Sequence, residues 1–442
     1  MKIMKKNKYF IYLLLLLPVL LVGSCTPEQD DYFDEPSSTR LAKLMSSTRK
    51  TLMDSEQGWL FEVFPGLKGQ EFGGFVYTTK FDSLTVSVRS EVAGDPAYEE
   101  TSYYKMTNEA GAAIIFDTNN QLIHALSEGT TDRYQALGGD IEFVIDSVGT
   151  DVIKVHGARS RNTCYFRRLT MSAEDYVKAV AAVQADFVYG NYYGTVGGKV
   201  VGVEFDLNAN QAYINPDTTQ TVEEISTAFI YTNTGIRFYK PITINGITVS
   251  EFVFNYDTGT LTGTDASGNT FALNGVLPEG YRKFADYEEG AYTLTYNNVS
   301  DKPVTKAVTL TRNSDNSFSM TGLFVNSPST AIKLIYNKAD GVLYWNSQAV
   351  GTEDGNTVWI CAWVMGGTLT WHTDAGLKTV WDGNETNPVY TWKNNGKTSY
   401  NFDSFIMWTL DSSGKSAGAY RGTTYSVDRS YRIRKVLSLT KN

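Results

Sequence analysis

Three histidines, His124, His156 and His372, supply all the imidazole that this sequence offers for acid–base or metal chemistry. They form no His-x-x-x-His pair and no Cys-x-x-Cys pair accompanies them, so no local motif assembles a zinc site. His372 follows Trp371 in a strand-like segment, where we expect a structural histidine rather than a ligand or base. The sequence therefore predicts neither a metal nor a cofactor.

The segment Gly414–Gly418 matches the G-x-S-x-G pattern of a hydrolase nucleophile. That pattern works where a strand turns sharply into a helix and a histidine follows along the chain. No histidine follows His372, and the surrounding residues are typical of a turn. A catalytic pair of carboxylates remains an alternative, because the sequence does not show which of its 48 acidic residues lie at the required separation. We expect a non-catalytic protein, with a hydrolase of dispersed carboxylates as an alternative.

The placement of tryptophan is more informative, since seven of the eight lie between residues 345 and 408. In the strand-like run Val358–Met365, Trp359 and Trp363 share one face with Cys361, and the even-numbered residues share the other. A strand that is apolar on both faces must be covered on both. One face is expected in a core, and the other against a neighbouring module, a partner protein or a ligand.

Trp381 and Trp392 flank polar, turn-rich segments at 382–387 and 393–397. Exposed aromatic rings offer flat apolar faces to sugar rings or peptide side chains. We therefore predict Trp381 and Trp392 as candidate ligand-binding residues, with core and hairpin packing as the structural alternative for the whole group.

The elements that carry these residues are mostly short strands, because Tyr, Phe, Thr and Val are abundant and turn residues recur between apolar stretches. The fold class predicted is mainly β, with two or three antiparallel barrel- or sandwich-like modules resembling a lipocalin-like meander. Two short helices interrupt the strands. One is capped by Ser38 or Thr39, and one begins at Ser172 with Asp175 in a capping-box position. Leu122–Ala125 is expected to be a strand.

Changes in composition divide the chain into modules. A helix and a β-meander are expected over residues 37–170, a helix and a β module over 171–280, and a Trp-rich β module over 285–442. The pair Asn245-Gly246 predicts a tight hairpin inside the second module.

The first 24 residues contain four lysines, no acidic residue and an apolar run too short to span a bilayer. This pattern is typical of an export signal, and Val22-Gly23-Ser24-Cys25 resembles a bacterial lipobox. We expect cleavage before Cys25 and lipidation of its thiol, which would anchor the protein to a membrane.

Residues 25–36 follow as an acidic, proline-containing tether. An acidic stretch after a lipidated cysteine resembles a surface-export signal. We therefore expect an outer-membrane protein that faces the cell surface, and a tether facing the periplasm is the alternative.

Loss of the four signal lysines takes the formal charge from −9 to −13. Nucleic-acid binding is not expected, because phosphate contact needs a basic surface. The remaining thiols, Cys164 and Cys361, lie nearly 200 residues apart in apolar patterns. We expect both to be buried core residues without a disulfide.

Several short motifs resemble an uncharacterised lipoprotein family, domain of unknown function 4302. They are Glu56-Gln57-Gly58-Trp59, Gly73-Gly74-Phe75, Gly138–Phe143 and Thr234–Tyr239. The resemblance covers about residues 34–280 and is weaker over 285–442. It implies a surface lipoprotein that accompanies TonB-dependent outer-membrane importers and their lid lipoproteins, and it implies no catalytic residues.

These observations favour an accessory or nutrient-binding component of an uptake system, with an oligosaccharide or peptide as ligand. Two alternatives remain, the hydrolase already described and a barrel that carries a small apolar ligand. The latter would require an interior cavity.

Overall fold

The structure is a computed structural model that describes residues 35–109, 111–131 and 133–442. The chain divides into two compact units, with the boundary between Val177 and Lys178. Three antiparallel sheets with few short helices form the framework of the described chain, which confirms the predicted mainly β fold class. No helix among the described residues is long and apolar enough to cross a membrane.

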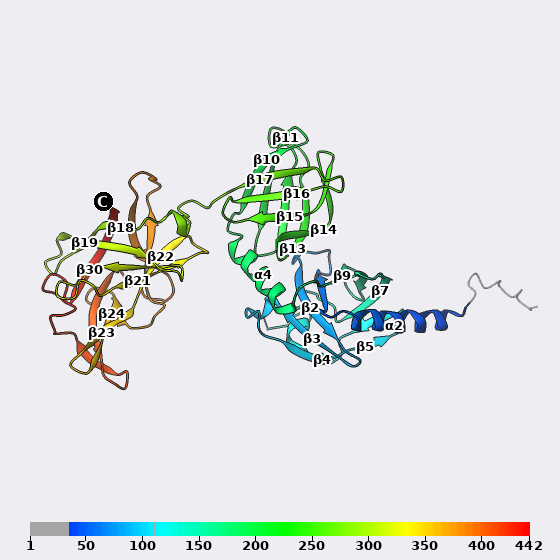
Figure 1. Ribbon diagram of the computed structural model, residues 1–442, viewed down its shortest axis with the longest axis horizontal. Helices are drawn as coiled ribbons and strands as arrows, with labels where there is room; N and C mark the ends of the chain where they lie inside the picture. The colour runs from blue at the N-terminus through cyan, green and yellow to red at the C-terminus, as the bar shows by residue number, and fades with distance from the viewer. Residues whose placement is uncertain (1–34, 110, 132) are drawn as a thin grey trace, which may run out of the picture. The chain divides into compact units, whose positions relative to one another are not determined.

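The first unit contains a nine-stranded sheet in the order β4-β3-β2-β1-β9-β8-β7-β6-β5 (Figure 1). Its strands are β1 (Trp59–Val63), β2 (Phe75–Phe81), β3 (Thr85–Ser90), β4 (Glu100–Tyr103), β5 (Lys105–Thr107), β6 (Ala113–Ile115), β7 (Glu142–Val148), β8 (Val152–Gly157) and β9 (Thr163–Arg168). Phe61 and Phe166 stack at the centre of its core, with ring centroids 4.0 Å apart. Cys164 is buried there with a free thiol, as expected.

Helix α2 (Ser37–Met53) packs Leu52 into this core. Its N-cap is Pro36, with no side-chain hydrogen bond, so the prediction of a Ser38 or Thr39 cap is wrong. The Pro36 carbonyl instead accepts the backbone N–H groups of Thr39 and Arg40. Proline with its fixed φ therefore starts the helix two or three residues earlier than the hydroxyl residues indicated.

Residues predicted as the strand Leu122–Ala125 form the helical turn α3 (Gln121–His124) instead. The side-chain oxygen of Asn120 accepts the N–H groups of Leu122 and Ile123, which favours a helix start over a strand. Helix α4 (Ala173–Asp186) begins as predicted, because the Asp175 N–H donates to Ser172 Oγ at 3.1 Å. The described residues thus hold three α-helices rather than two, and the 3₁₀ turns η1 (Glu91–Ala93) and η2 (Phe284–Asp286).

The second sheet is a closed eight-stranded barrel, drawn in green in Figure 1. Its strands follow chain order: β10 (Asn191–Val196), β11 (Lys199–Asp206), β12 (Gln211–Asn215), β13 (Ile225–Tyr231), β14 (Gly235–Ile244), β15 (Ile247–Asn255), β16 (Thr260–Thr264) and β17 (Thr270–Val276). β14 and β15 meet at Asn245-Gly246, both with positive φ, which confirms the predicted tight hairpin.

Aromatic rings occupy the interior of this barrel. Phe205 contacts both Tyr192 and Phe229 edge to face, with centroids 5.6 and 5.4 Å apart. All three side chains are buried. An interior filled in this way is a packed core, and it lends no support to the alternative of an apolar-ligand carrier.

The third sheet has thirteen strands. Eight of them close into a ring in the order β18-β19-β20-β21-β22-β26-β27-β30, because β30 also pairs with β18. Their bounds are β18 (Gly290–Asn297), β19 (Pro303–Arg312), β20 (Ser317–Thr321), β21 (Ile332–Asn337), β22 (Val342–Asn346), β26 (Gly376–Trp381), β27 (Val389–Asn394) and β30 (Arg432–Lys441).

The remaining strands form a branch that continues from β30 through β28 and β24 to β23. They are β23 (Gln348–Glu353), β24 (Asn356–Trp363), β25 (Leu369–Thr370), β28 (Ser404–Leu410) and β29 (Ser416–Ala419). One face of the branch, with Ile360 and Met407, packs into the main core of this sheet. The opposite face carries a separate apolar cluster that includes Trp363 and Ile406.

Candidate functional site

Trp392, predicted as an exposed ligand-binding residue, lies in the core of the third sheet. Its side chain is 9% exposed, and its ring packs edge to face on Trp345 with centroids 5.6 Å apart. The expectation of exposure is therefore wrong. The turn after Trp392 shows where β27 ends but does not show which way the side chain points. Thr391 and Lys393 on either side of Trp392 are exposed, and side chains alternate along a strand, so Trp392 points inward.

Trp381 lies at the end of β26 and packs against the same core. Its Nε1–H donates to the Asn384 carbonyl at 3.3 Å, and the buried guanidinium of Arg282 sits 4.7 Å from the ring centre. One side of the partly exposed indole is therefore covered by an arginine. The structure does not bring Trp381 and Trp392 together on an exposed surface.

Aromatic side chains do gather on the outer face of the branch. We define the aromatic face as Trp359, Trp363, Trp408 and Tyr431, which pack on buried Cys361 and Ile406. Trp359 and Trp408 are direct cross-strand partners in the β24–β28 pair. Both remain partly exposed, while Ile360 and Met407 beside them point into the core. This confirms the two-faced reading of Val358–Met365.

Polar contacts fix the orientation of the rings on the aromatic face. Trp408 Nε1–H donates to Ser416 Oγ at 2.8 Å. The Arg432 guanidinium lies 4.8 Å from the ring centre of Tyr431 and 5.5 Å from that of Trp363. Cation–π contacts of this kind stabilise the rings without covering the whole surface. The aromatic face is thus a preformed apolar platform with a positive edge.

Exposed apolar residues continue from the aromatic face into the turn that joins β24 to β25. Leu369 pairs with Trp363 across this hairpin and packs in the same cluster. Met365 and Trp371 follow on the two arms and are 45% and 39% exposed. Contiguous exposed apolar residues of this kind are typical of interaction sites.

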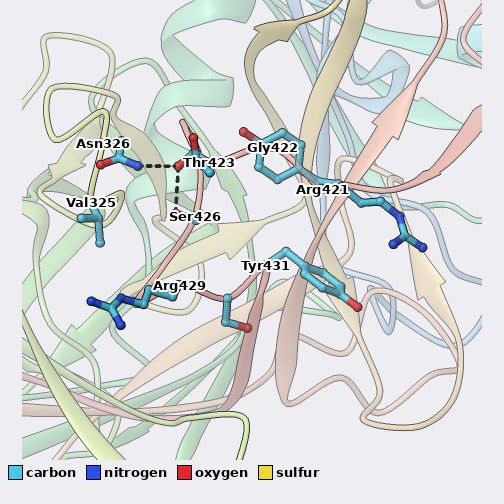
Figure 2. A pocket seen from close by; sticks show the side chains of 10 residues that line it. Val325, Asn326, Arg421, Gly422, Thr423, Ser426, Arg429 and Tyr431 are labelled. Atoms are coloured by element: carbon cyan, nitrogen blue, oxygen red, sulfur yellow. Dashed lines mark hydrogen bonds between the residues drawn. The ribbon is translucent and has the colours of Figure 1, made fainter.

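A pocket of about 490 Å³ adjoins the aromatic face. We call it the arginine pocket, and Tyr431 belongs to both features. Its lining residues are Val325, Asn326, Tyr420, Arg421, Gly422, Thr423, Ser426, Arg429, Ser430 and Tyr431. Figure 2 shows Arg421 and Arg429 directed to opposite sides, with Tyr431 on the side of Arg421. The Thr423 carbonyl accepts from Asn326 Nδ2 at 3.1 Å and Ser426 Oγ at 2.8 Å, which holds the loop in place.

The chemistry available for catalysis at this site is limited. Burial raises the pKa of the Cys361 thiol to about 12, so it stays protonated and unreactive at neutral pH. Ser416 of the G-x-S-x-G segment begins strand β29 after a hairpin turn, and it accepts a hydrogen bond from Trp408. This confirms the turn expected there and not a strand-to-helix elbow.

The three histidines lie on separate elements of the chain. His124 ends α3 and His156 lies on β8, where its Nδ1 is 2.7 Å from Asp146 Oδ1 and its Nε2 is 3.0 Å from an Arg161 nitrogen. His372 is largely exposed, 3.9 Å from Asp374. Within the described ranges, no group of three His, Cys, Asp or Glu side chains could hold a metal ion. Cys25, the predicted lipid site, lies outside the described residues.

Sequence reasoning missed Trp408 and the arginine pocket. The alternation of Ile406 and Trp408 with Phe405 and Met407 carried the same two-faced signal as Val358–Met365. Arg421 and Arg429 lie in irregular segments, whose side-chain directions no periodicity predicts.

Comparison with known proteins gives two family matches and no function. A search of curated proteins finds no match. Among solved structures, a protein of unknown function from the DUF3598 family of Nostoc punctiforme PCC 73102 is 10% identical over 58% of this chain and 96% of its own, with a TM-score of 0.13. The DNA polymerase sliding clamp of Pseudomonas aeruginosa is 13% identical over 78% and 95%, with a TM-score of 0.12. Scores this low carry no argument about the present chain.

The family models extend the resemblance seen in the sequence. A second domain of unknown function, DUF4987, matches residues 264–408, which include Trp359, Trp363 and Trp408. The Trp-rich region thus matches a different model from the rest, in line with its weaker resemblance to the first family. The model of DUF4302 matches residues 29–256, more than half of the chain, and the protein therefore belongs to the family named domain of unknown function 4302.

Proposed function

We propose that this protein is a non-catalytic, lipid-anchored binding protein of the outer-membrane surface, an accessory or nutrient-binding component of a TonB-dependent uptake system. The observation that carries the proposal is the outward-facing pair Trp359 and Trp408 on the aromatic face. Apolar side chains that lie side by side at the surface, rimmed by polar residues, often mark interaction sites. Aromatic rings suit the apolar face of a sugar or a peptide side chain.

Several features support a binding role over a catalytic one. At the aromatic face, the Cys361 thiol stays protonated, and the Ser416 hydroxyl accepts a hydrogen bond from Trp408. Asp411, in the adjoining β28–β29 turn, has its pKa lowered by the Ser413 hydroxyl and by backbone N–H groups, and it serves that turn. The family resemblance, the lipobox and the acidic tether support a location at the outer membrane beside importer complexes.

The binding role is tested by calorimetric titration of the purified full chain with a panel of oligosaccharides and peptides. We expect Trp359→Ala combined with Trp408→Ala to lower affinity for the bound ligand about tenfold or more, since two stacking surfaces are lost. Tyr134→Ala is the matched control, because Tyr134 is 92% exposed in the first unit. Trp381→Ala tests the surface first predicted from sequence.

The outcomes separate the candidate functions. Unchanged affinity in the double variant would remove the aromatic face from the proposal. Turnover of any member of the panel would favour the hydrolase alternative. The anchor is tested separately: Cys25→Ser should abolish incorporation of labelled fatty acid. Cross-linking in intact cells should then link the wild-type chain to a large outer-membrane importer.

A further inference from the structure

The arginine pocket carries two exposed positive charges. Arg421 and Arg429 are exposed, and neither has an ion-pair partner among the residues that the structure describes. Arg432, at the edge of the aromatic face, lies against the rings of Tyr431 and Trp363 and has no ion-pair partner in that same part of the chain. Three unpaired arginines in one neighbourhood contrast with the chain's formal charge of −9.

Two acidic side chains beside this loop, Asp428 and Glu353, are already engaged. Asp428 accepts the hydroxyl of Tyr296 and lies 3.5 Å from the Lys306 ammonium. Glu353 accepts the hydroxyl groups of Tyr420 and Thr424. Neither carboxylate forms an ion pair with Arg421 or Arg429, although Glu353 and Asp354 share a neighbouring hollow with Arg421.

The backbone at Arg429 is an independent observation. Val427 and Ser430 exchange hydrogen bonds of 2.7 and 2.8 Å, and the two residues between them have φ of 45° and 63°. Positive φ at both central positions is the geometry of a type I′ turn, which strongly prefers glycine at the second position. The chain instead holds an arginine there, in a conformation that costs a residue with a side chain about 1–2 kcal/mol. Backbone strain of this kind clusters at ligand-binding positions.

The arrangement also limits what could bind. Because Arg421 and Arg429 point to opposite sides of the pocket, they are not placed to grip one carboxylate together (Figure 2). They suit charges repeated along an extended ligand. Tyr431 between the pocket and the aromatic face offers a ring on which a sugar could stack, and the hydroxyl groups of Thr423, Ser426 and Ser430 offer polar contacts.

We infer that the arginine pocket and the aromatic face together bind an anionic saccharide chain, with carboxylate or sulfate groups on Arg421 and Arg429 and sugar rings on Tyr431, Trp359 and Trp408. This inference rests on the proposed binding function and names its ligand class. Arginine recognises both anions by the same charge-assisted, bidentate hydrogen bonds.

The test is calorimetric titration of the full chain with three galactose-based oligosaccharides of equal length: neutral galactan, oligogalacturonate and sulfated galactan. The second and third distinguish carboxylate from sulfate as the bound anion. We expect at least one charged form to bind tenfold or more tighter than the neutral form, with affinity falling as NaCl increases. Polyglutamate is the fourth probe, since an acidic peptide carries charge without sugar rings.

Variants assign the effect to the pocket. Arg421→Ala and Arg429→Gly should each weaken the charged ligand at least fivefold, and Lys415→Ala, an exposed cation on the β28–β29 turn, should leave it unchanged. Arg429→Gly relieves the strained turn, so lost binding in a fully folded variant cannot be attributed to misfolding.

Three results would overturn the inference. Equal affinity for neutral and charged galactans would reject the anionic ligand and leave the proposed binding function standing. Tighter binding of polyglutamate than of any saccharide would reject the saccharide. Failure of every saccharide and peptide to bind at millimolar concentration would reject the proposed function as well.

Discussion

The closed barrel of β10–β17 and the Trp-rich sheet of β18–β30 differ in where their large aromatic side chains point. In the barrel, the large rings of Tyr192, Phe205 and Phe229 point inward and are buried. The Trp-rich sheet also closes a ring of eight strands, but β28, β24 and β23 continue beyond it. A closed sheet needs one apolar face, whereas the branch has two, and the second face is where Trp359 and Trp408 lie. The surplus face therefore identifies the candidate site.

The largest expected effects are losses of unfolding free energy when large aromatic side chains are replaced by alanine. Trp345→Ala, in the core beneath the branch, should cost about 3–5 kcal/mol of unfolding free energy, and Phe205→Ala in the barrel a similar amount. Trp408→Ala on the aromatic face should cost about 1 kcal/mol or less, because its ring is already partly in water. Urea unfolding followed by circular dichroism measures all three. If Trp408→Ala proved as destabilising as Trp345→Ala, the aromatic face would be a second core and not a platform.

Sequence alone could predict the two faces of Val358–Met365, because strand periodicity is local and both faces were apolar. The turn residues beside Trp392 mark the end of β27 and not the direction of its side chain, which its alternation with polar Thr391 and Lys393 indicates. The strand predicted at Leu122–Ala125 failed for a related reason, since one side chain, Asn120, redirects the backbone into a helix. The arginine pocket brings Val325 and Asn326 to a loop about 100 residues later, and no local pattern carries that contact.

The first unit contains a buried carboxyl group, that of Glu91, in contrast to the exposed arginines of the pocket. Burial raises the pKa of Glu91 to about 7, although its carboxylate accepts the Val76 N–H and the Ser90 hydroxyl. A carboxyl whose folded pKa exceeds its unfolded value of about 4.3 stabilises the fold below that unfolded value. The contribution is lost as pH rises to 7 and above.

Glu91→Gln keeps an oxygen for the Val76 N–H and removes the titration. We expect it to raise unfolding free energy by roughly 1–3 kcal/mol at pH 8 and to change it little at pH 5. Scanning calorimetry between pH 5 and 8 measures the difference, with Glu71→Gln on an exposed loop as control. A variant effect that did not vary across this range would mean that Glu91 is ionised throughout and that the fold tolerates its charge.

The smallest effect compares two tight turns of the same geometry. Asn245-Gly246 joins β14 to β15 with φ of 48° and 87°, and Asp428-Arg429 precedes β30 with φ of 45° and 63°. Gly246→Ala should lower the unfolding free energy by about 1 kcal/mol. An added Cβ meets no atom within 4 Å, so the penalty comes from the positive φ alone.

Arg429→Gly should raise the unfolding free energy by roughly 0.5–1 kcal/mol, because relief of strain exceeds the added freedom of glycine in the unfolded chain. Thermal melting of both variants tests the pair. A stability loss in Arg429→Gly would assign the arginine a structural contact and remove strain as evidence for a binding role. A gain together with weakened anion binding would mean that the turn sacrifices stability to present a guanidinium.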